Sequence, residues 1–181
     1  AIDKPAGMAV HGGSGVSFGV IERLRATRPE SRFLELVHRL DRETSGVLII
    51  AKKRSALTRL HAAWRAGQIV KRYLALARGR IARAKETVRV PLRRYLTKEG
   101  ERRVSVDRAE GQDAVSIVEP LRASDAATLV RVTIETGRTH QIRVHLAHLR
   151  HPVLGDDKYG DFDLNRALRA AGLKRMFLHA E

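Results

Sequence analysis

Three strand-length segments rich in β-branched residues follow one another in the middle of the chain. They are Arg103–Asp107, Ala114–Glu119 and Thr128–Glu135, and short turns separate them. Successive short strands with turn residues between them are typical of an antiparallel meander. We therefore expect this part of the chain to be built from antiparallel β-structure.

The rest of the chain alternates irregularly between strand and helix patterns. Val47–Ala51 is a continuous apolar run that predicts a central buried strand, and Arg72–Ala77 is similar. Amphipathic helix patterns cover Ser17–Ala26, Ser55–Gly67 and Asp163–Gly172, with Ser55 and Asp163 as the expected caps of the last two. Strands outnumber helices, so the pattern predicts an α+β domain built on a large mixed, mainly antiparallel sheet.

The composition favours a polyanionic partner. The 181 residues include 35 Lys and Arg against 20 Asp and Glu, which gives a formal net charge of +15. A charge of this size attracts anions, and the planar guanidinium of Arg matches the geometry of phosphate. An Arg-rich soluble protein without such a partner is the alternative. The absence of Cys excludes disulfides, thiolate metal ligands and Cys nucleophiles.

The length predicts one domain over residues 1–181. No apolar run approaches the ~18 residues that span a membrane, and Asp3 and Lys4 come too early for a secretory leader. We therefore expect a cytoplasmic protein, and a monomer. Both ends are strand-like, as expected for a domain trimmed from a longer chain.

The densest polar segment is HRLDRETSG, from His38 to Gly46, and it lies directly before the apolar run. Side chains at the mouth of a core strand are held rigidly, which suits catalysis. Asp41 lies between Arg39 and Arg42, and a nearby guanidinium lowers the pKa of a carboxylate, which keeps it ionised as a nucleophile or a base. A turn residue in a surface ion pair is the alternative, and the spacing alone does not decide between the two.

A second polar segment precedes a predicted helix over residues 140–149, which Thr139 is expected to cap. The turn before it carries Arg138 and free backbone N–H groups at the start of the helix, a geometry that binds anions. His140 and Arg143 share one face of the helix. An ordinary cationic amphipathic helix is the alternative.

Two Arg doublets, Arg93-Arg94 and Arg102-Arg103, flank a predicted turn at Lys98–Gly100. If the flanking segments form a hairpin, its sides carry four Arg that could bind a nucleic-acid backbone. An edge strand protected by its charge is the alternative.

Metal and nucleotide motifs are weak. His145 and His148 are three residues apart, but no HExxH motif is present, and Asp156 and Asp157 come later in a turn. The glycines of Gly12–Gly19 match neither the dinucleotide fingerprint nor a phosphate-binding P-loop. We therefore expect no cofactor and no metal, although a His-cluster metallohydrolase stays open as an alternative.

The segment HRLDRETSG resembles the signature HRLDxxTSG of the RluA-type pseudouridine synthases. Five further segments resemble elements of this family in the same order: DKPAGMAVHGG (3–13), KRYLA (71–75), TGRTHQIRVH (136–145), HPVLGDDKYG (151–160) and FLHA (177–180). The resemblance implies the pseudouridine synthase fold, with a mixed sheet in two subdomains and an active-site cleft between them. It also implies the isomerisation of uridine in RNA without a cofactor.

Within the family, the segments around residues 12–25 and 32–46 are most similar to members that modify large-subunit ribosomal RNA. Such members carry an S4-like RNA-binding domain before the catalytic domain, so this chain is expected to be a catalytic domain alone. A non-catalytic module that binds ribosomal RNA also explains the charge, and stays open as an alternative.

The resemblance assigns roles to individual residues. Asp41 would be the essential carboxylate, which either attacks the substrate covalently or abstracts a sugar proton. Tyr73 would pack against the uracil and is a candidate base at C5, although a phenol with a pKa near ~10 is a poor base unless its environment tunes it. Arg143 would pair with Asp41, and Arg39 would fill the stack that the flipped base leaves. The expected supporting residues are His38, Arg42, Arg138, Thr139 and His140.

Overall fold

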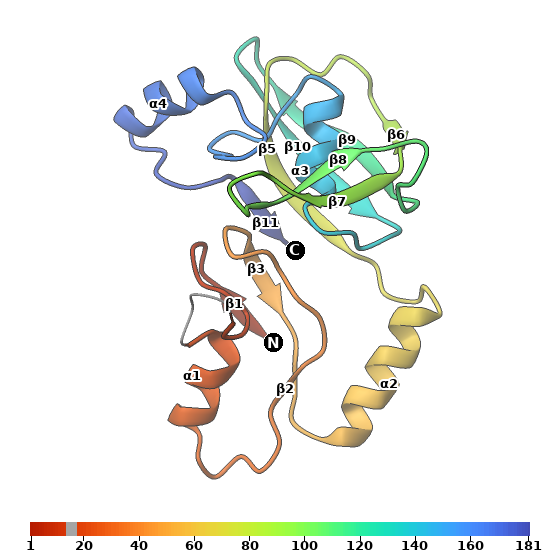
Figure 1. Ribbon diagram of the computed structural model, residues 1–181, viewed down its shortest axis with the longest axis vertical. Helices are drawn as coiled ribbons and strands as arrows, with labels where there is room; N and C mark the ends of the chain where they lie inside the picture. The colour runs from red at the N-terminus through yellow and green to blue at the C-terminus, as the bar shows by residue number, and fades with distance from the viewer. Residues whose placement is uncertain (14–17) are drawn as a thin grey trace. The chain divides into compact units, whose positions relative to one another are not determined.

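The chain divides into two compact units. The first contains Ala1–Val70 together with His179–Glu181, and the second contains Lys71–Leu178. The computed structural model describes residues 1–13 and 18–181 (Figure 1). The last strand, β11 (Leu178–Ala180), therefore begins in the second unit and ends in the first.

The first unit is built from short strands and two helices. In chain order its elements are β1 (Ile2–Lys4), α1 (Val20–Thr27), β2 (Glu35–Leu36), β3 (Ser45–Leu48), β4 (Ile50–Ala51) and α2 (Arg54–Arg65). Strand β3 pairs antiparallel with β1 and parallel with the end of β11, and β2 pairs antiparallel with β4. The Ser45 hydroxyl and His179 Nδ1 lie 2.9 Å apart and add a side-chain hydrogen bond between β3 and β11.

The apolar run that predicted one central strand forms two strands in different sheets. The chain changes partner at Ile49, whose N–H donates to His38 Nε2 at 3.1 Å and whose carbonyl accepts from the Val37 N–H at 3.1 Å. Leu48 is fully buried, but Val47 is 37% exposed. The prediction of a single buried strand was therefore wrong, because the switch of pairing partner leaves no trace in the local apolar pattern.

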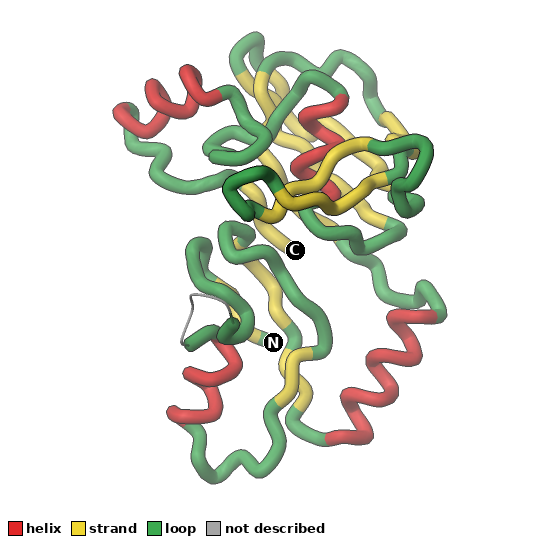
Figure 2. The backbone as a smooth tube through the Cα atoms, viewed as in Figure 1, coloured by secondary structure: helices red, strands yellow, loops and turns green. Residues whose placement is uncertain are grey.

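The second unit contains most of the β-structure (Figure 2). Its elements are β5 (Arg72–Arg78), β6 (Glu86–Arg89), β7 (Leu92–Leu96), β8 (Arg102–Val106), β9 (Val115–Ala123), β10 (Ala127–Ile134), α3 (Gln141–His148) and α4 (Phe162–Ala170). Strand β10 pairs antiparallel with β5 on one side and β9 on the other, and β6 pairs with β9. The pairings of both units give the strand order β1-β3-β11-β5-β10-β9-β6, which confirms the predicted mixed, mainly antiparallel sheet.

The meander prediction holds for β9 and β10 but not for β8. Strand β8 pairs with β7 in a separate two-stranded sheet, in which Arg94 lies opposite Val104 and Leu96 lies opposite Arg102. The hairpin predicted around the turn at residues 98–100 is therefore confirmed. Its inward face joins a small buried cluster formed by Leu92, Val104, Ala114 and Val144.

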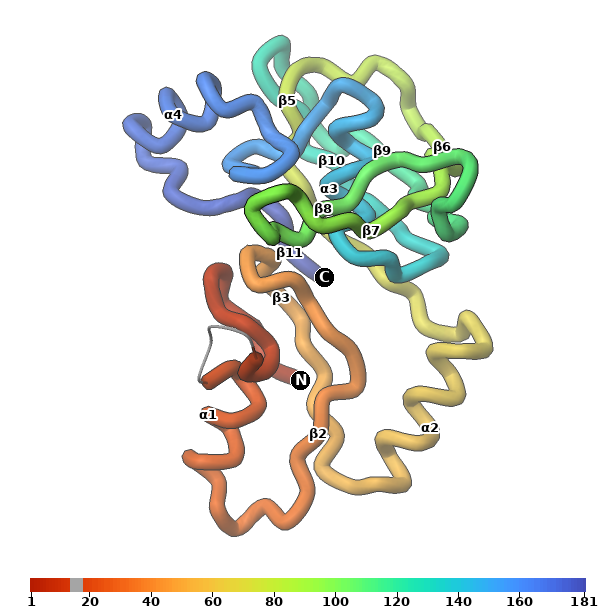
Figure 3. The backbone as a smooth tube through the Cα atoms, in the orientation of Figure 1, coloured from red at the N-terminus to blue at the C-terminus, as the bar shows by residue number. Residues whose placement is uncertain are grey.

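Helix α3 packs against the sheet through alternating apolar side chains. Along β10 the buried residues are Thr128, Val130, Val132 and Ile134, as the period of two residues requires. Val130 and Val132 belong to the same buried cluster as Ile142 and Leu146 of α3. Figure 3 traces the path from β10 to α3 along the chain. This packing fixes the turn that precedes α3.

The expected helix caps were wrong in position. Helix α2 begins at Arg54 with Lys53 at its N-cap, so Ser55 already lies inside the helix. Helix α4 is capped by Asp161, which accepts a hydrogen bond from the Leu164 N–H at 3.0 Å, and not by Asp163. The start of the first helix, expected at Ser17, lies outside the described residues. Within the described residues, no helix combines the length and the apolar character needed to cross a membrane.

Gly46 provides a test of the pairing between β3 and β11. Its φ is +110°, and a Cβ at this position would overlap the backbone of Ala180. We expect Gly46→Ala to lower the free energy of unfolding by about 1–3 kcal/mol from backbone strain alone, and by more from the overlap. Urea denaturation followed by circular dichroism measures this change.

Gly137→Ala is the matched control. Gly137 has no positive φ, and a Cβ there would meet no atom within 4 Å. The free energy of unfolding should therefore stay within about 0.5 kcal/mol of the wild type. A Gly46→Ala protein as stable as this control would contradict the observed pairing of β3 with β11.

Candidate active site

The candidate residues fall into two groups, one in each unit. The first unit carries those of the HRLDRETSG segment: His38, Arg39, Asp41 and Arg42. The second unit carries Tyr73, Arg93, Arg94, Arg102, Arg103, Arg138, Thr139, His140 and Arg143. The pairing of Arg143 with Asp41 that the resemblance implies stays a prediction.

Asp41 lies in the loop between β2 and β3. The Thr44 N–H donates to the Asp41 carbonyl at 3.1 Å, so residues 41–44 form a tight turn directly before β3. Leu40, Thr44 and Ser45 are buried, whereas Asp41 is only partly buried. Buried neighbours on both sides hold the backbone of a partly exposed carboxylate in place, which is what a reactive side chain requires.

His38 anchors the start of this loop. Its Nε2 accepts the Ile49 N–H, and its ring stacks on Trp64 of α2 with the ring centroids 4.9 Å apart. Burial lowers the pKa of His38, so the imidazole stays neutral and its Nε2 can act as an acceptor. His38 therefore positions the loop. Arg39 and Arg42 are exposed, and Arg42 forms an ion pair with Glu43 at 3.1 Å.

Lys4 is a site residue that the sequence pattern does not single out. It is fully buried, and its Nζ donates to the carbonyl oxygens of Pro5 at 2.9 Å, Met8 at 2.8 Å and Arg42 at 3.0 Å. The Gly7 N–H donates to the same Arg42 carbonyl at 2.9 Å. The opening segment and the Asp41 loop are thus joined through one ammonium group. The one sequence signal that could have identified Lys4 is its position in the segment DKPAGMAVHGG, which resembles the opening element of the family.

Burial lowers the pKa of Lys4 to about 8, although the negative charges of Glu43 and Asp41 oppose this shift. The three carbonyl groups that receive its hydrogen bonds carry no formal charge. Near neutral pH, Lys4 therefore supplies a positive potential at the base of the Asp41 loop.

In the second unit, Arg143 is held by a buried carboxylate. Its Nε and Nη2 bond to the two oxygens of Asp156, both at 2.7 Å, and the side chains are 3% and 0% exposed. Burial disfavours the charged form of Asp156, but the hydrogen bonds and charge of Arg143, together with the Lys158 and Tyr159 N–H groups, lower its pKa overall. Asp156 therefore fixes the orientation of the guanidinium, which also lies 5.0 Å from the Tyr159 ring centroid.

Tyr73 lies near the start of β5, where it is opposite Val132 of β10. It is partly buried, and it packs against the main apolar cluster of the second unit. The sheet therefore holds the ring in a fixed position, which suits the expected packing against a planar base.

Gln141 organises the turn before α3, and Thr139 does not cap the helix. The N-cap is His140, in a left-handed conformation with a φ of 53°. The Gln141 Oε1 accepts from the Thr136 hydroxyl at 2.8 Å and from the Arg138 N–H at 3.0 Å. The Arg138 N–H is therefore not free to bind an anion, which corrects the expectation for this turn.

The hydrogen bonds of Tyr159 indicate which ring nitrogen of His140 acts as an acceptor. The Tyr159 hydroxyl accepts the Val104 N–H at 2.9 Å, so its own proton is available for His140 Nδ1, which lies 2.7 Å away. Burial raises the pKa of Tyr159 to about 12, which keeps this proton in place. We infer that His140 accepts at Nδ1, so in a neutral ring the proton is on Nε2.

His145 is a buried structural residue. Its Nδ1 lies 2.9 Å from the Ser116 hydroxyl and its Nε2 lies 3.3 Å from the Val90 carbonyl, and burial lowers its pKa to about 4. Gln141 donates to Ser116 at 3.0 Å, so the polar groups form one connected network. Over residues 1–13 and 18–181, no cluster of three His, Cys, Asp or Glu side chains could hold a metal ion.

The four hairpin Arg residues differ in their partners. Arg93 pairs with Asp107 at 3.2 Å and with Glu110 at 2.6 Å, and Arg103 pairs with Glu101 at 2.7 Å. Alternation along the strands places Arg94 and Arg102 on the face that also carries Leu92 and Val104, and Arg93 and Arg103 on the other. Arg94 and Arg102 are both exposed. In the described part of the chain, no carboxylate lies within 4 Å of these two guanidinium groups.

Comparison with known proteins identifies the family to which this chain belongs. Residues 1–148 match the family model described as RNA pseudouridylate synthase. The chain belongs to the RNA pseudouridylate synthase family. It is 54% identical to ribosomal large subunit pseudouridine synthase C of Escherichia coli over 181 residues, and 52% identical to the protein of that name from Yersinia pestis over 179 residues.

These matches cover 99% of this chain but only 56% of each relative, so the chain spans just over half the length of these curated family members. Solved structures of the family agree with the fold. Human RNA pseudouridylate synthase domain containing 1 gives a TM-score of 0.80 at 28% identity, over 98% of this chain and 71% of the other. Human RNA pseudouridylate synthase domain containing 4 gives 0.77 at 27% identity, over 99% and 78%.

Lys4 makes stability depend on pH. Between its folded pKa of about 8 and the ordinary lysine value of 10.5, the unfolded chain holds the proton and the folded chain does not. The free energy of unfolding should therefore rise with pH across this window. We expect the difference in unfolding free energy between the wild type and Lys4→Met to grow from pH 7 to pH 10, measured by urea denaturation. A constant difference would show that the folded protein does not perturb this ammonium group.

Asp156→Asn tests the support of Arg143. The variant leaves a buried guanidinium without its carboxylate, so the free energy of unfolding should fall by about 3–5 kcal/mol. Asp157→Asn is the control, because this carboxylate is 62% exposed and lies 3.7 Å from Arg143, and it should cost less than about 1 kcal/mol. Equal effects of the two substitutions would contradict the assigned role of Asp156.

Proposed function

We propose that this protein converts uridine to pseudouridine in large-subunit ribosomal RNA, with Asp41 as the essential carboxylate. The observation that carries the proposal is the HRLDRETSG loop itself, which belongs to an RNA pseudouridylate synthase chain and presents a partly exposed Asp41 in a turn bounded by the buried Leu40 and Thr44. The relatives named ribosomal large subunit pseudouridine synthase C support the choice of RNA.

The proposed reaction is an isomerisation. The bond from C1′ to N1 of the uridine breaks, the base turns, and a bond from C1′ to C5 forms. Asp41 either attacks C1′ and is later released, or removes a proton from the sugar and later returns it. The C5 proton leaves once the new bond has formed, and N1 gains a proton, so the product has the composition of the substrate.

The chain offers groups for each requirement of this reaction. A uridine in folded RNA hides its sugar and C5 edge, so it must be extruded, which costs about a few kcal/mol. The exposed side chain of Arg39 would fill the vacated stack, and cations such as Arg42 and Arg138 would bind phosphates. Tyr73 would support the uracil ring. Arg143, whose orientation Asp156 fixes, would pair with Asp41 and orient its carboxylate.

Thr139 and His140, in the turn that Gln141 organises, would support substrate binding, as the family resemblance implies. No step of the proposal needs a metal or a cofactor, since the carboxylate, the ring and the guanidinium supply the chemistry. Large-subunit ribosomal RNA, or a particle that contains it, is the proposed partner.

Replacement of Asp41 tests the proposal directly. We expect Asp41→Asn and Asp41→Ala to abolish the release of tritium from C5-labelled uridine in large-subunit ribosomal RNA transcribed in vitro. The dissociation constant for the RNA should change by less than about threefold, because electrostatic contacts elsewhere carry most of the affinity. Asp3→Asn, an exposed acid on β1 in the same unit, is the control and should keep full activity.

Two outcomes would count against the proposal. Full activity in either Asp41 variant would remove this carboxylate from the chemistry. Tight RNA binding by the wild type without any conversion of uridine would instead favour a non-catalytic RNA-binding module.

A further inference from the structure

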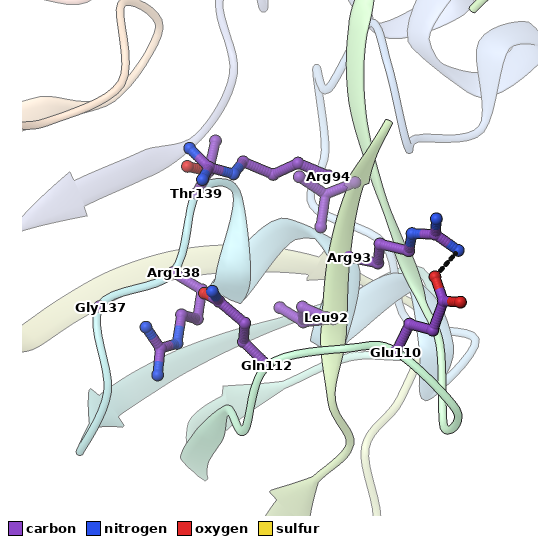
Figure 4. Close-up of a pocket in the computed structure, with 9 residues that line it drawn as sticks. Leu92, Arg93, Arg94, Glu110, Gln112, Gly137, Arg138 and Thr139 are labelled. Carbon is purple, nitrogen blue, oxygen red and sulfur yellow. Dashed lines mark ion pairs between the residues drawn. The ribbon is translucent and has the colours of Figure 1, made fainter. Parts of the chain in front are cut away.

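The second unit contains a polar pocket of about 360 Å³ that lies apart from the Asp41 loop in the sequence (Figure 4). Three segments form it: the β7–β8 hairpin with residues from both strands, the loop that follows the hairpin, and the turn before α3. The volume is near the lower end of the ~300–1000 Å³ that small-molecule pockets span. The pocket therefore has room for one nucleotide and excludes a duplex.

The charge of the pocket favours an anion. Arg93, Arg94 and Arg138 line it together with one carboxylate, Glu110, which is already paired with Arg93. Figure 4 shows Arg93 directed to Glu110, whereas Arg94 extends toward Thr139. Arg93 is thus neutralised, and Arg94 and Arg138 provide the net positive charge.

Arg138 is positioned for a ligand. Its Nε donates to the Asp113 carbonyl at 3.0 Å, which fixes the plane of the guanidinium. Among the described residues, its terminal amino groups make no hydrogen bond, and its side chain is exposed. A guanidinium held at one nitrogen presents its other donors in a fixed geometry, which suits the oxygens of a phosphate.

Gly137 leaves one wall of the pocket open. Its φ is not positive, and a Cβ would meet nothing within 4 Å, so neither the turn nor the packing requires glycine here. A glycine without either requirement is typical of sites where a ligand approaches the backbone closely. The Gln141 side chain accepts a hydrogen bond from the Arg138 N–H, and this bond holds the backbone around Gly137 in place before a ligand binds.

The remaining lining residues fit a base. Leu92 and Val104, each 4% exposed, form a small apolar floor, and Gln112 contributes an amide that can both donate and accept. Gln112 is held in place by two backbone hydrogen bonds with Leu92, both 2.9 Å long. A phosphate alone would need neither the apolar surface nor the amide.

We propose that this pocket binds one unstacked nucleotide of the RNA substrate, with its phosphate between Arg94 and Arg138 and its base against Leu92 and Gln112. The proposal rests on the proposed function, because it takes RNA as the substrate. It extends the substrate-binding role proposed for Arg138 and Thr139, because the pocket would select RNAs that present an unpaired nucleotide.

Binding measurements with Arg94→Gln and Gly137→Ala test the pocket, both in an Asp41→Asn background that stops turnover. Arg94→Gln should raise the dissociation constant by roughly threefold to tenfold and reduce the slope of its logarithm against log salt by about 0.7–0.9, as expected for one lost phosphate contact. Gly137→Ala should raise the dissociation constant without changing the slope, because it blocks space and removes no charge.

Arg122→Gln is the matched control, since Arg122 is an exposed cation on β9 of the same unit and does not line the pocket. It should leave both quantities as in the parent protein, and circular dichroism should show that all the variants are folded. If Arg94→Gln and Gly137→Ala match this control, the pocket does not bind RNA.

Titration with uridine monophosphate and, separately, inorganic phosphate distinguishes a nucleotide from its phosphate. Uridine monophosphate should shift the amide resonances of Gly137 and Thr139 at concentrations at which inorganic phosphate has no effect. Equal shifts would overturn the nucleotide assignment.

Measuring pseudouridine formation together with RNA binding distinguishes a failure of the pocket proposal from a failure of the proposed function. With Asp41 intact, pseudouridine formation together with no effect of the pocket variants on binding would overturn the pocket alone. Weakened binding in the pocket variants, with no pseudouridine formed by the wild type, would overturn the proposed function alone.

Discussion

The buried ammonium group of Lys4 is the interaction on which the geometry around Asp41 depends. An ion in the protein interior loses its hydration, at an effective cost of several kcal/mol, and needs excellent hydrogen-bond geometry in return. Here three backbone carbonyls supply that geometry, and the Arg42 carbonyl belongs to the Asp41 loop. Because carbonyls solvate the charge without cancelling it, the same interaction fixes the loop and supplies a positive potential beneath it.

The second unit also contains a buried cation, but there a carboxylate provides the countercharge. Arg143 is buried on α3, and Asp156 both neutralises it and aligns it through two short hydrogen bonds. Asp156 is itself fixed by the backbone N–H groups of Lys158 and Tyr159 at 2.8 and 3.0 Å. A rigid network of this kind limits the motion of a charged group that has no solvent to reorganise, which is the condition for preorganised electrostatics.

In the second unit, β5, β9, β10 and the β7–β8 hairpin could be predicted, because alternation and turn residues are local signals. The helix starts could not, because a cap is selected by tertiary contacts. Thr139 has the right chemistry for a cap, but the side chain of Gln141, held by Val115 and Ser116, already satisfies the turn. Asp161 and Asp163 are equally good cap residues in sequence, and only the packing of α4 distinguishes them.

The same distinction applies to charge. The motif identifies Asp41, but nothing local shows that Lys4 and Asp156 are buried, because burial depends on segments far away in the chain. The net charge of +15 also does not show which basic side chains are left without a countercharge. On the hairpin, Glu101, Asp107 and Glu110 neutralise Arg93 and Arg103 on one face, while Arg94 and Arg102 on the other face have no countercharge among the residues that the structure describes. Acidic residues therefore shape the charge of this surface as much as the basic ones, because they determine which guanidinium groups are left without a countercharge.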